Sequence, residues 1–305
     1  MFKLKKLLFH KPLSLFLTYL VAITLYSSLN AEDKILIMTY VHSRPDFIDL
    51  HIKTFNAFLQ DEYRYVVFND APNNNMKQQI EETCARLGVE CLRVPDHNAD
   101  RVGKPGHRHI DGIKFSLEQV GFDYDGIVVM IDADMFLIKQ FNIKEYLQNY
   151  DLIAWYQDRE GNGKKVIYMA PSLVFMDMRT LPNKRTINFE GGNIEGLPCD
   201  VGGQMYYYFK NNPTLKMKFY GIESTADLPK NEATLKSMGF NQNDIQFVLS
   251  LKKRYAGFDF HGDKNFMHFY AGGSNWAGYT AALVQEKTNI LNNYIDESIN
   301  CYKNQ

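Results

Sequence analysis

The chain has 305 residues, of which 45% are hydrophobic and 23% are charged, as in an ordinary globular protein. This length suits one large α/β domain or at most two small ones. The net charge is −1, and after residue 31 there are 30 basic against 35 acidic side chains, so charge gives no basis for binding nucleic acid.

The first 31 residues have the layout of a secretory signal peptide. They hold four lysines and no acid, followed by an uncharged run over residues 13–26 and small residues ending at Ala31. The run is shorter than the roughly 20 residues that a membrane span needs, so a cleaved signal and an uncleaved anchor both stay open. In either case we expect residues 32–305 to form one exported domain, in a secretory lumen or the cell envelope. An anchor would also hold the protein at a membrane.

Export would place the four cysteines in an oxidising compartment. Cys84 lies near the end of a predicted helix and Cys91 lies in the strand after it, so these two could form a disulfide. Cys199 and Cys301 could form a second one, although only their number suggests it. There is no C-x-x-C spacing, so the sequence does not indicate a zinc or redox motif.

From residue 34 onward, apolar strands alternate with helices. The predicted strands of the first half are 34–40, 63–68, 90–94 and 126–131. The predicted helices there are 44–59, 74–87 and 109–120. This alternation predicts a Rossmann-like α/β fold with a mainly parallel central sheet flanked by helices.

The second half is less regular. Strands are predicted at 165–170 and 173–178, and helices at 200–210, 244–253 and 280–294. The remaining segments, 182–197 and 221–243, are rich in loop-forming residues, and we expect them to build an acceptor site.

The predicted strand 126–131 runs directly into Asp132 and Asp134, which we call the acidic pair. The cost of burying charge favours carboxylates at the end of a buried strand, and ligands of α/β sheets bind beyond the carboxyl ends of the strands. Mg²⁺ and Mn²⁺ bind one or two carboxylates and fill their other positions with water and phosphate oxygens. The pattern therefore suggests a metal ion that holds a diphosphate. The alternative is that Asp132 caps the strand and Asp134 is an ordinary turn residue.

Four segments in chain order resemble the GT-A glycosyltransferases, which are nucleotide-diphospho-sugar transferases. They are the opening strand 35–40, the DxD motif Asp132-Ala133-Asp134, the strand Pro171-Ser172-Leu173-Val174-Phe175-Met176, and the segment from His268 to Trp276. The last resembles the H-x-x-G-x-x-K-P-W motif of the glycogenin-like branch, glycosyltransferase family 8. Asp200-Val201-Gly202 is similar to the D-Q-G element of that branch.

The resemblance covers roughly residues 34–280 and has departures. Ser274-Asn275 replaces Lys-Pro, the glycine spacing is shifted by one, and Pro171 and Leu173 replace the Asn and Gly of the branch. The branch therefore stays open, and with it the question of whether the sugar retains its configuration.

The resemblance implies a hexosyltransferase-type enzyme that uses Mn²⁺ or Mg²⁺ and a nucleotide-sugar, with a UDP-sugar favoured over a GDP-sugar. The acceptor would be a glycan, a protein or a lipid. The implied metal ligands are Asp132, Asp134 and His268. The implied donor-binding residues are Thr39, Tyr40, Asp70, Arg108, Asp111, Lys114, Asp132, Ala133, Gly272 and Gly273, and Arg101 and Lys104 are further candidates for the diphosphate.

Asp200 and Gln204 are the candidate catalytic residues, as an acid–base or charge-stabilising pair, and Asp244 is their rival. A structural role is the alternative for each single residue, such as a core position for His268 or a helix cap for Asp244. For the whole chain, the alternative is a catalytically inactive GT-A-like domain that binds carbohydrate or acts as a scaffold. A nucleotidyltransferase is disfavoured because no glycine follows the first strand in 41–45.

Overall fold

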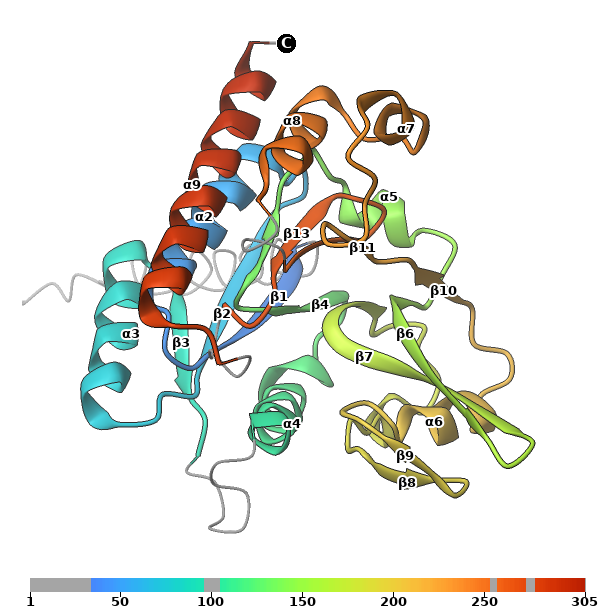
Figure 1. Ribbon diagram of the computed structural model, residues 1–305. Coiled ribbons are helices and arrows are strands. Elements are labelled where there is room, and N and C mark those ends of the chain that lie inside the picture. The colour runs from blue at the N-terminus through green and yellow to red at the C-terminus, as the bar shows by residue number, and fades with distance from the viewer. Residues whose placement is uncertain (1–33, 96–104, 253–256, 273–277, 305) are drawn as a thin grey trace, which may run out of the picture. The chain divides into compact units, whose positions relative to one another are not determined.

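The computed structural model describes residues 34–95, 105–252, 257–272 and 278–304 (Figure 1). A seven-stranded sheet with the order β10-β6-β7-β4-β1-β2-β3 forms its centre. Its strands are β1 Ile35–Val41, β2 Tyr63–Asn69, β3 Glu90–Arg93, β4 Ile127–Asp132, β6 Leu152–Gly161, β7 Lys164–Asp177 and β10 Met217–Tyr220. The β3, β2, β1 and β4 strands are mutually parallel, as are β6 and β10, whereas β7 is antiparallel to both of its neighbours. The predicted α/β fold with a mainly parallel sheet is therefore confirmed.

Helices cover both faces of this sheet (Figure 1). They are α2 Asp46–Phe58, α3 Asn74–Leu87, α4 Pro105–Ser116, α5 Ile143–Leu147, α6 Met205–Asn211, α7 Glu232–Ser237, α8 Gln242–Ser250 and α9 Ala281–Lys303. One π-helical turn, Leu117–Gly121, extends α4. Local sequence sets the ends of α3, because the Asn73 side chain accepts a hydrogen bond from the Met76 N–H at its start and Gly88 in left-handed conformation ends it.

Alternating side chains of the strands divide the interior into two cores. Along β1, Ile35 and Ile37 belong to the core that includes residues of α2, α3 and α9. Leu36 and Met38 belong to the core on the opposite face, which includes residues of α4 and α6. This is the period of two expected when both faces of a strand are covered, and it explains the uninterrupted apolar run of β1.

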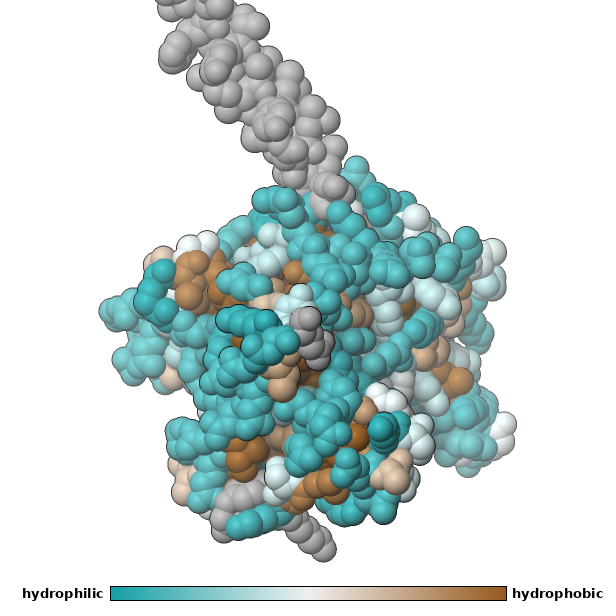
Figure 2. Space-filling model, turned by 90° about the horizontal axis from the view of Figure 1, so that it is seen from above, coloured by the Kyte–Doolittle hydropathy of each residue, from teal (hydrophilic) through white to brown (hydrophobic). Residues whose placement is uncertain are grey.

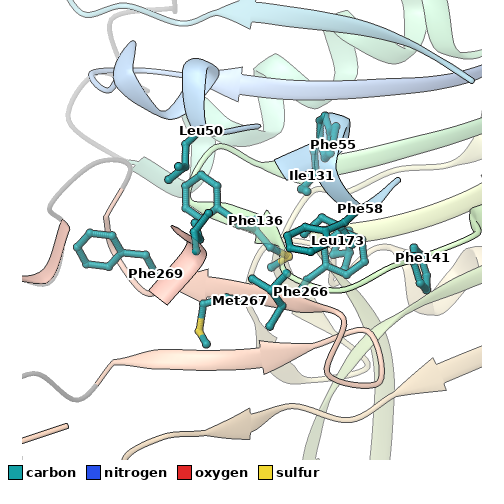
Figure 3. Packing of buried hydrophobic residues seen from close by; sticks show 14 of the residues in the cluster. Leu50, Phe55, Phe58, Ile131, Phe136, Phe141, Leu173, Phe266, Met267 and Phe269 are labelled. Atoms are coloured by element: carbon teal, nitrogen blue, oxygen red, sulfur yellow. The ribbon is translucent and has the colours of Figure 1, made fainter. Parts of the chain in front are cut away.

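A second, four-stranded antiparallel sheet continues from the acidic pair. Its order is β11-β12-β13-β5, with β5 Met135–Leu137, β11 Glu223–Ser224, β12 Phe258–His261 and β13 Phe266–Phe269. β5 begins three residues after β4 ends and aligns Met135 with His268 of β13. Figure 3 shows Phe136 and Phe266 in the core that joins this sheet to the main one, together with Leu173 of β7. This packing places β13 beside the acidic pair.

The structure corrects several predicted elements of the second half. The two strands predicted at 165–170 and 173–178 are one strand, β7, and its partner β6 was not predicted. The helix predicted from residue 200 begins only at Met205, and the helix predicted to end at 294 continues to Lys303. The segments predicted as loops contain short elements, namely β8 Gly192–Ile194, the start of β9 Leu197–Cys199, the 3-10 turn Lys184–Thr186, β11 and α7.

The predicted N-terminal targeting segment, residues 1–31, lies outside the described residues. Among the helices of the described part, none is both long and apolar enough to cross a membrane. Figure 2 shows one face of the molecule, which is hydrophilic over most of its area and has small, separate hydrophobic patches.

All four cysteines are free thiols in the structure, so neither predicted disulfide is formed. The thiol of Cys84 is nevertheless hydrogen-bonded to that of Cys91, and this contact raises the pKa of Cys84. Cys199 is buried in β9, and Cys301 is exposed on α9.

Candidate active site

A pocket of about 460 Å³ lies where β1, β2 and β4 end. Strands, the helix α4 and several loops supply its walls. The lining residues are Tyr40, His42, Asp70, Gly106, Arg108, His109, Gly112, Asp132, Ala133, Asp134, Asp200, Val201, His268 and Ala271. This volume is within the range of small-molecule sites, and the position is the one where α/β sheets bind ligands.

Asp132, Asp134 and His268 form what we call the first cluster. Each offers one donor atom, and the three atoms lie within 4.8 Å of one another. Asp132 is the last residue of β4, and the backbone oxygen of Asp134 accepts a hydrogen bond of 2.7 Å from the Phe269 N–H, next to His268 in β13. Two carboxylates and one imidazole are a donor set that fits Mn²⁺.

His268 lies beside the carboxylates of the first cluster, which affect its pKa. Its Nε2 lies 3.5 Å from Asp134 Oδ1. Burial lowers the pKa of His268, but the neighbouring carboxylates, Asp134 foremost, outweigh burial and raise it overall. The carboxylates thus favour a proton on His268, and a cation bound to the ring would compete with that proton.

His109 of α4 makes a second pairing of this kind on the other side of the acidic pair. Its Nε2 lies 3.2 Å from Asp132 Oδ1. Burial lowers the pKa of His109, and the carboxylates of Asp132, Asp70 and Asp134 raise it further than burial lowers it. The helix can approach this closely because Gly112 faces the ring of Tyr40, where a Cβ would lie 3.2 Å from Tyr40 Cδ1.

The charged pair Asp70 and Arg108 lines the pocket at the end of β2. Arg108 Nε lies 2.9 Å from Asp70 Oδ2, and His42 Nδ1 lies 2.7 Å from the backbone oxygen of Asp70. Asp70 is buried, whereas Arg108 and His42 are half-buried. The pair presents hydrogen-bonding groups of both signs to the pocket.

Asp200 reaches the pocket from a tight turn before α6. Its Oδ1 accepts a hydrogen bond of 2.8 Å from the Val201 N–H, and the Asp200 N–H bonds to the Tyr168 hydroxyl at 3.2 Å. Gly202 in this turn has a φ of +94°, and a Cβ there would lie 1.9 Å from the backbone oxygen of Met169 in β7. The turn that carries the exposed carboxylate of Asp200 is thereby packed closely against β7.

Among the predicted site residues, the structure brings together eight in one pocket. They are Tyr40, Asp70, Arg108, Asp132, Ala133, Asp134, Asp200 and His268.

Five other predicted site residues do not line the pocket, namely Thr39, Asp111, Lys114, Gln204 and Gly272. Thr39 is fully buried because it points to the opposite face of β1 from Tyr40, and Lys114 is exposed on α4. Gly272 is buried, and its backbone oxygen accepts a hydrogen bond from Arg44. Gly273, Ser274–Trp276, Arg101 and Lys104 lie outside the described residues.

Asp244, the rival catalytic residue, is structural. It is 1% exposed and caps α8 in a reciprocal arrangement with Asn241. It also accepts hydrogen bonds from Tyr294 and lies 2.6 Å from Lys139 Nζ. All of these contacts are made outside the pocket.

Sequence reasoning missed His42, His109 and Gly112 as pocket residues. A signal for two of them was present, because Arg108, His109 and Gly112 have the spacing of one helix face. For His42, which follows β1 after one residue, no comparable pattern exists.

No family model matches the sequence, and no curated protein is similar to it. Among solved structures, the galactosyltransferase LgtC, in complex with donor and acceptor sugar analogs, is 12% identical, with a TM-score of 0.42 over 83% of this chain and 95% of that one. The mannosyltransferase PcManGT from Pyrobaculum calidifontis, in complex with GDP-Man and Mn²⁺, is 11% identical, with a TM-score of 0.40 over 61% of this chain and 54% of that one. S. aureus TarS is 14% identical, with a TM-score of 0.33 over 52% of this chain, and the match spans only 30% of TarS.

Proposed function

We propose that this protein is a metal-dependent glycosyltransferase that moves a hexosyl group from a nucleoside-diphosphate donor to an acceptor hydroxyl. The observation that carries the proposal is the first cluster, Asp132, Asp134 and His268, set inside the pocket at the carboxyl ends of the strands. Hard oxygen donors at such a position suit a cation that shares its coordination with a diphosphate.

The residues around the cluster suggest a division of roles. A divalent ion bound by the first cluster would stabilise the negative charge of the departing diphosphate as a Lewis acid. Tyr40, at the end of β1, and the paired Asp70 and Arg108, at the end of β2, would contact the nucleoside. Asp200 is the pocket carboxylate outside the first cluster and the Asp70–Arg108 pair, so it would act on the reacting hydroxyl or on the developing positive charge of the sugar.

His109 completes this arrangement as a group that orients Asp132. Its Nε2 is 3.2 Å from Asp132 Oδ1, so it restricts the rotation of a metal ligand. Partners of ligating carboxylates commonly have this role in metal sites.

We further propose that the N-terminal segment directs the enzyme to a secretory lumen or the cell envelope, where it meets a glycan, protein or lipid acceptor.

The first test measures binding of UDP and of GDP to the full chain by calorimetry, with Mn²⁺ and with EDTA. We expect one of the two nucleotides to bind only with Mn²⁺, and Asp134→Asn to abolish that binding. Asp296→Asn is the matched control, because Asp296 is an exposed carboxylate that pairs with Lys53 outside the pocket. Failure of both nucleotides to bind the folded protein would contradict the proposal.

A second measurement separates a transferase from an inactive binding domain. UDP-glucose, UDP-galactose and GDP-mannose are incubated with the protein and Mn²⁺, and release of the nucleoside diphosphate is followed. We expect Asp200→Asn to keep nucleotide affinity and to lower the release rate by about 10²- to 10⁴-fold. Nucleotide binding without any turnover of these donors would instead favour the carbohydrate-binding or scaffold alternative.

A further inference from the structure

A second group of side chains that could bind a metal ion shares His268 with the first cluster. Asp259, His261 and His268 each offer a donor atom, and these three atoms also lie within 4.8 Å of one another. The β12 and β13 strands are antiparallel and align Asp259 with His268. His261 is two residues from Asp259 on the same strand, so all three side chains stand on one face of the second sheet. We call Asp259, His261 and His268 the second cluster.

His261 is the unusual member of the second cluster. It is 1% exposed, and neither of its ring nitrogens has a hydrogen-bond partner among the residues that the structure describes. Aromatic rings surround it, with the Trp155 centroid at 6.2 Å, Tyr220 at 5.9 Å and His268 at 5.2 Å. A buried polar group without a partner costs free energy, and a metal ion bound to one of its nitrogens would remove part of that cost.

His51 shows how this protein treats a buried histidine with a purely structural role. It is also 1% exposed, but its Nδ1 bonds to the Tyr65 hydroxyl at 2.6 Å and its Nε2 to the Met135 backbone oxygen at 2.8 Å. Both nitrogens of His51 are therefore satisfied by the protein itself. The nitrogens of His261 are therefore available to a ligand. Asp259 and His268 each have a donor atom close enough to bind the same metal ion as His261.

We propose that Asp259, His261 and His268 form a second divalent-metal site, which takes Zn²⁺ or Co²⁺ in preference to Mn²⁺. Two imidazoles and one carboxylate are a common three-residue donor set for zinc, with a water in the fourth position. The first cluster has two carboxylates and one imidazole, a more oxygen-rich set that suits Mn²⁺ and Mg²⁺. The two clusters thus differ in the metal that they favour.

The two clusters share His268, so they do not act independently. A zinc ion in the second cluster would engage His268 and leave the first cluster with two carboxylates. Zn²⁺ would then weaken Mn²⁺-dependent nucleotide binding, an effect that rests on the proposed function. The existence of the zinc site itself does not rest on it.

The experiment isolates the second cluster by disabling the first. The full chain with Asp132→Asn and Asp134→Asn keeps all three residues of the second cluster. We expect it to bind one Zn²⁺ per chain in calorimetry and to give the visible absorption of tetrahedral Co²⁺. Adding His261→Phe keeps an aromatic ring against Trp155 and Tyr220, and we expect it to raise the Kd for Zn²⁺ by about 100-fold or more.

Two further variants keep the outcome interpretable. His107→Asn, which changes an exposed histidine of α4, is the matched control and should leave Zn²⁺ affinity unchanged. Asp259→Asn should weaken Zn²⁺ binding as His261→Phe does, and it serves if His261→Phe fails to fold. Zn²⁺ binding that is absent, or that is unaffected by both second-cluster variants, would overturn the proposal even if nucleotide binding is as expected.

In the protein with an intact first cluster, Zn²⁺ is then titrated into the complex with Mn²⁺ and nucleotide. We expect Zn²⁺ to lower nucleotide affinity and His261→Phe to relieve that effect. Equal inhibition with and without His261 would show that Zn²⁺ acts in the first cluster, and it would overturn the coupling between the two sites.

Discussion

The pKa values of four histidines, His51, His109, His261 and His268, are shifted in two opposite directions. Burial lowers the pKa of His51 and of His261, because it disfavours the charged ring. Burial acts in the same direction on His109 and His268, yet the pKa of each is raised, since the carboxylates of the pocket outweigh it. The direction of each pKa shift therefore depends on whether nearby carboxylates outweigh burial.

His51 gives a prediction for the dependence of stability on pH. Burial lowers its pKa in the folded protein to about 4, from an ordinary value of 6.5. Below pH 6.5 the unfolded chain takes up a proton that the folded chain does not, so this contribution to stability is complete above pH 6.5 and is lost as the pH falls toward 4. The loss amounts to about 3 kcal/mol.

The variant His51→Gln separates this effect from that of other groups. Glutamine can still donate to the Met135 oxygen and accept from the Tyr65 hydroxyl, but it does not titrate. We expect His51→Gln to be less stable than wild type at pH 7, and the difference to shrink by about 2–3 kcal/mol by pH 4.5. Urea unfolding at the two pH values measures this, and an unchanged difference would contradict the assignment.

Among the structural elements, the turn that carries Asp200 leaves no room for a side chain at Gly202. Gly202 has a φ of +94°, and a Cβ would lie 1.9 Å from the Met169 oxygen. We expect Gly202→Ala to lower the free energy of unfolding by about 2 kcal/mol or more, because it adds a backbone clash to an unfavourable φ.

Gly163→Ala is the control for that prediction. Gly163 has a φ of +71°, with no atom within 4 Å of the position of a Cβ, so it carries the backbone strain without the clash. Chemical denaturation of both variants gives the comparison. If Gly163→Ala costs as much stability as Gly202→Ala, the close approach of the turn to β7 does not matter.

Local pattern explains why the first half of the chain could be predicted and much of the second half could not. β1, β2 and β4 are apolar runs with helices between them, so each is visible in a short window. β5 has only three residues, and its partner β13 lies about 130 residues further along the chain. The second half of β6 ends in the polar run Gln157–Gly161, which has no apolar pattern that would indicate a strand.

The same reasoning applies to the pocket. Asp132 and Asp134 could be found because two carboxylates follow a buried strand directly, and the other motifs of the chain strengthened that signal. His268 was suggested by resemblance, and the structure shows that a non-local strand pairing brings it to the acidic pair. Thr39 was implied by the resemblance, and Gln204 was a candidate because its amide could stabilise charge beside Asp200. Thr39 is fully buried on β1, and Gln204 directly precedes α6 without lining the pocket.

On the scale of the whole molecule, the first cluster spans a seam between two sheets. Asp132 ends a strand of the main sheet, and His268 belongs to the second sheet. A cation that bound both would link sheets that are otherwise joined here by side-chain packing and by hydrogen bonds such as that from the Phe269 N–H to the Asp134 oxygen. Local opening of the second sheet would then require the cation to leave.

Amide hydrogen exchange would make this link visible. We expect Mn²⁺ with nucleotide to slow exchange in β12 and β13 and to leave exchange in β3, at the far edge of the main sheet, as it is. A bound ligand would therefore act as a clasp between the two sheets, and the second sheet would open less often while the ligand stays bound.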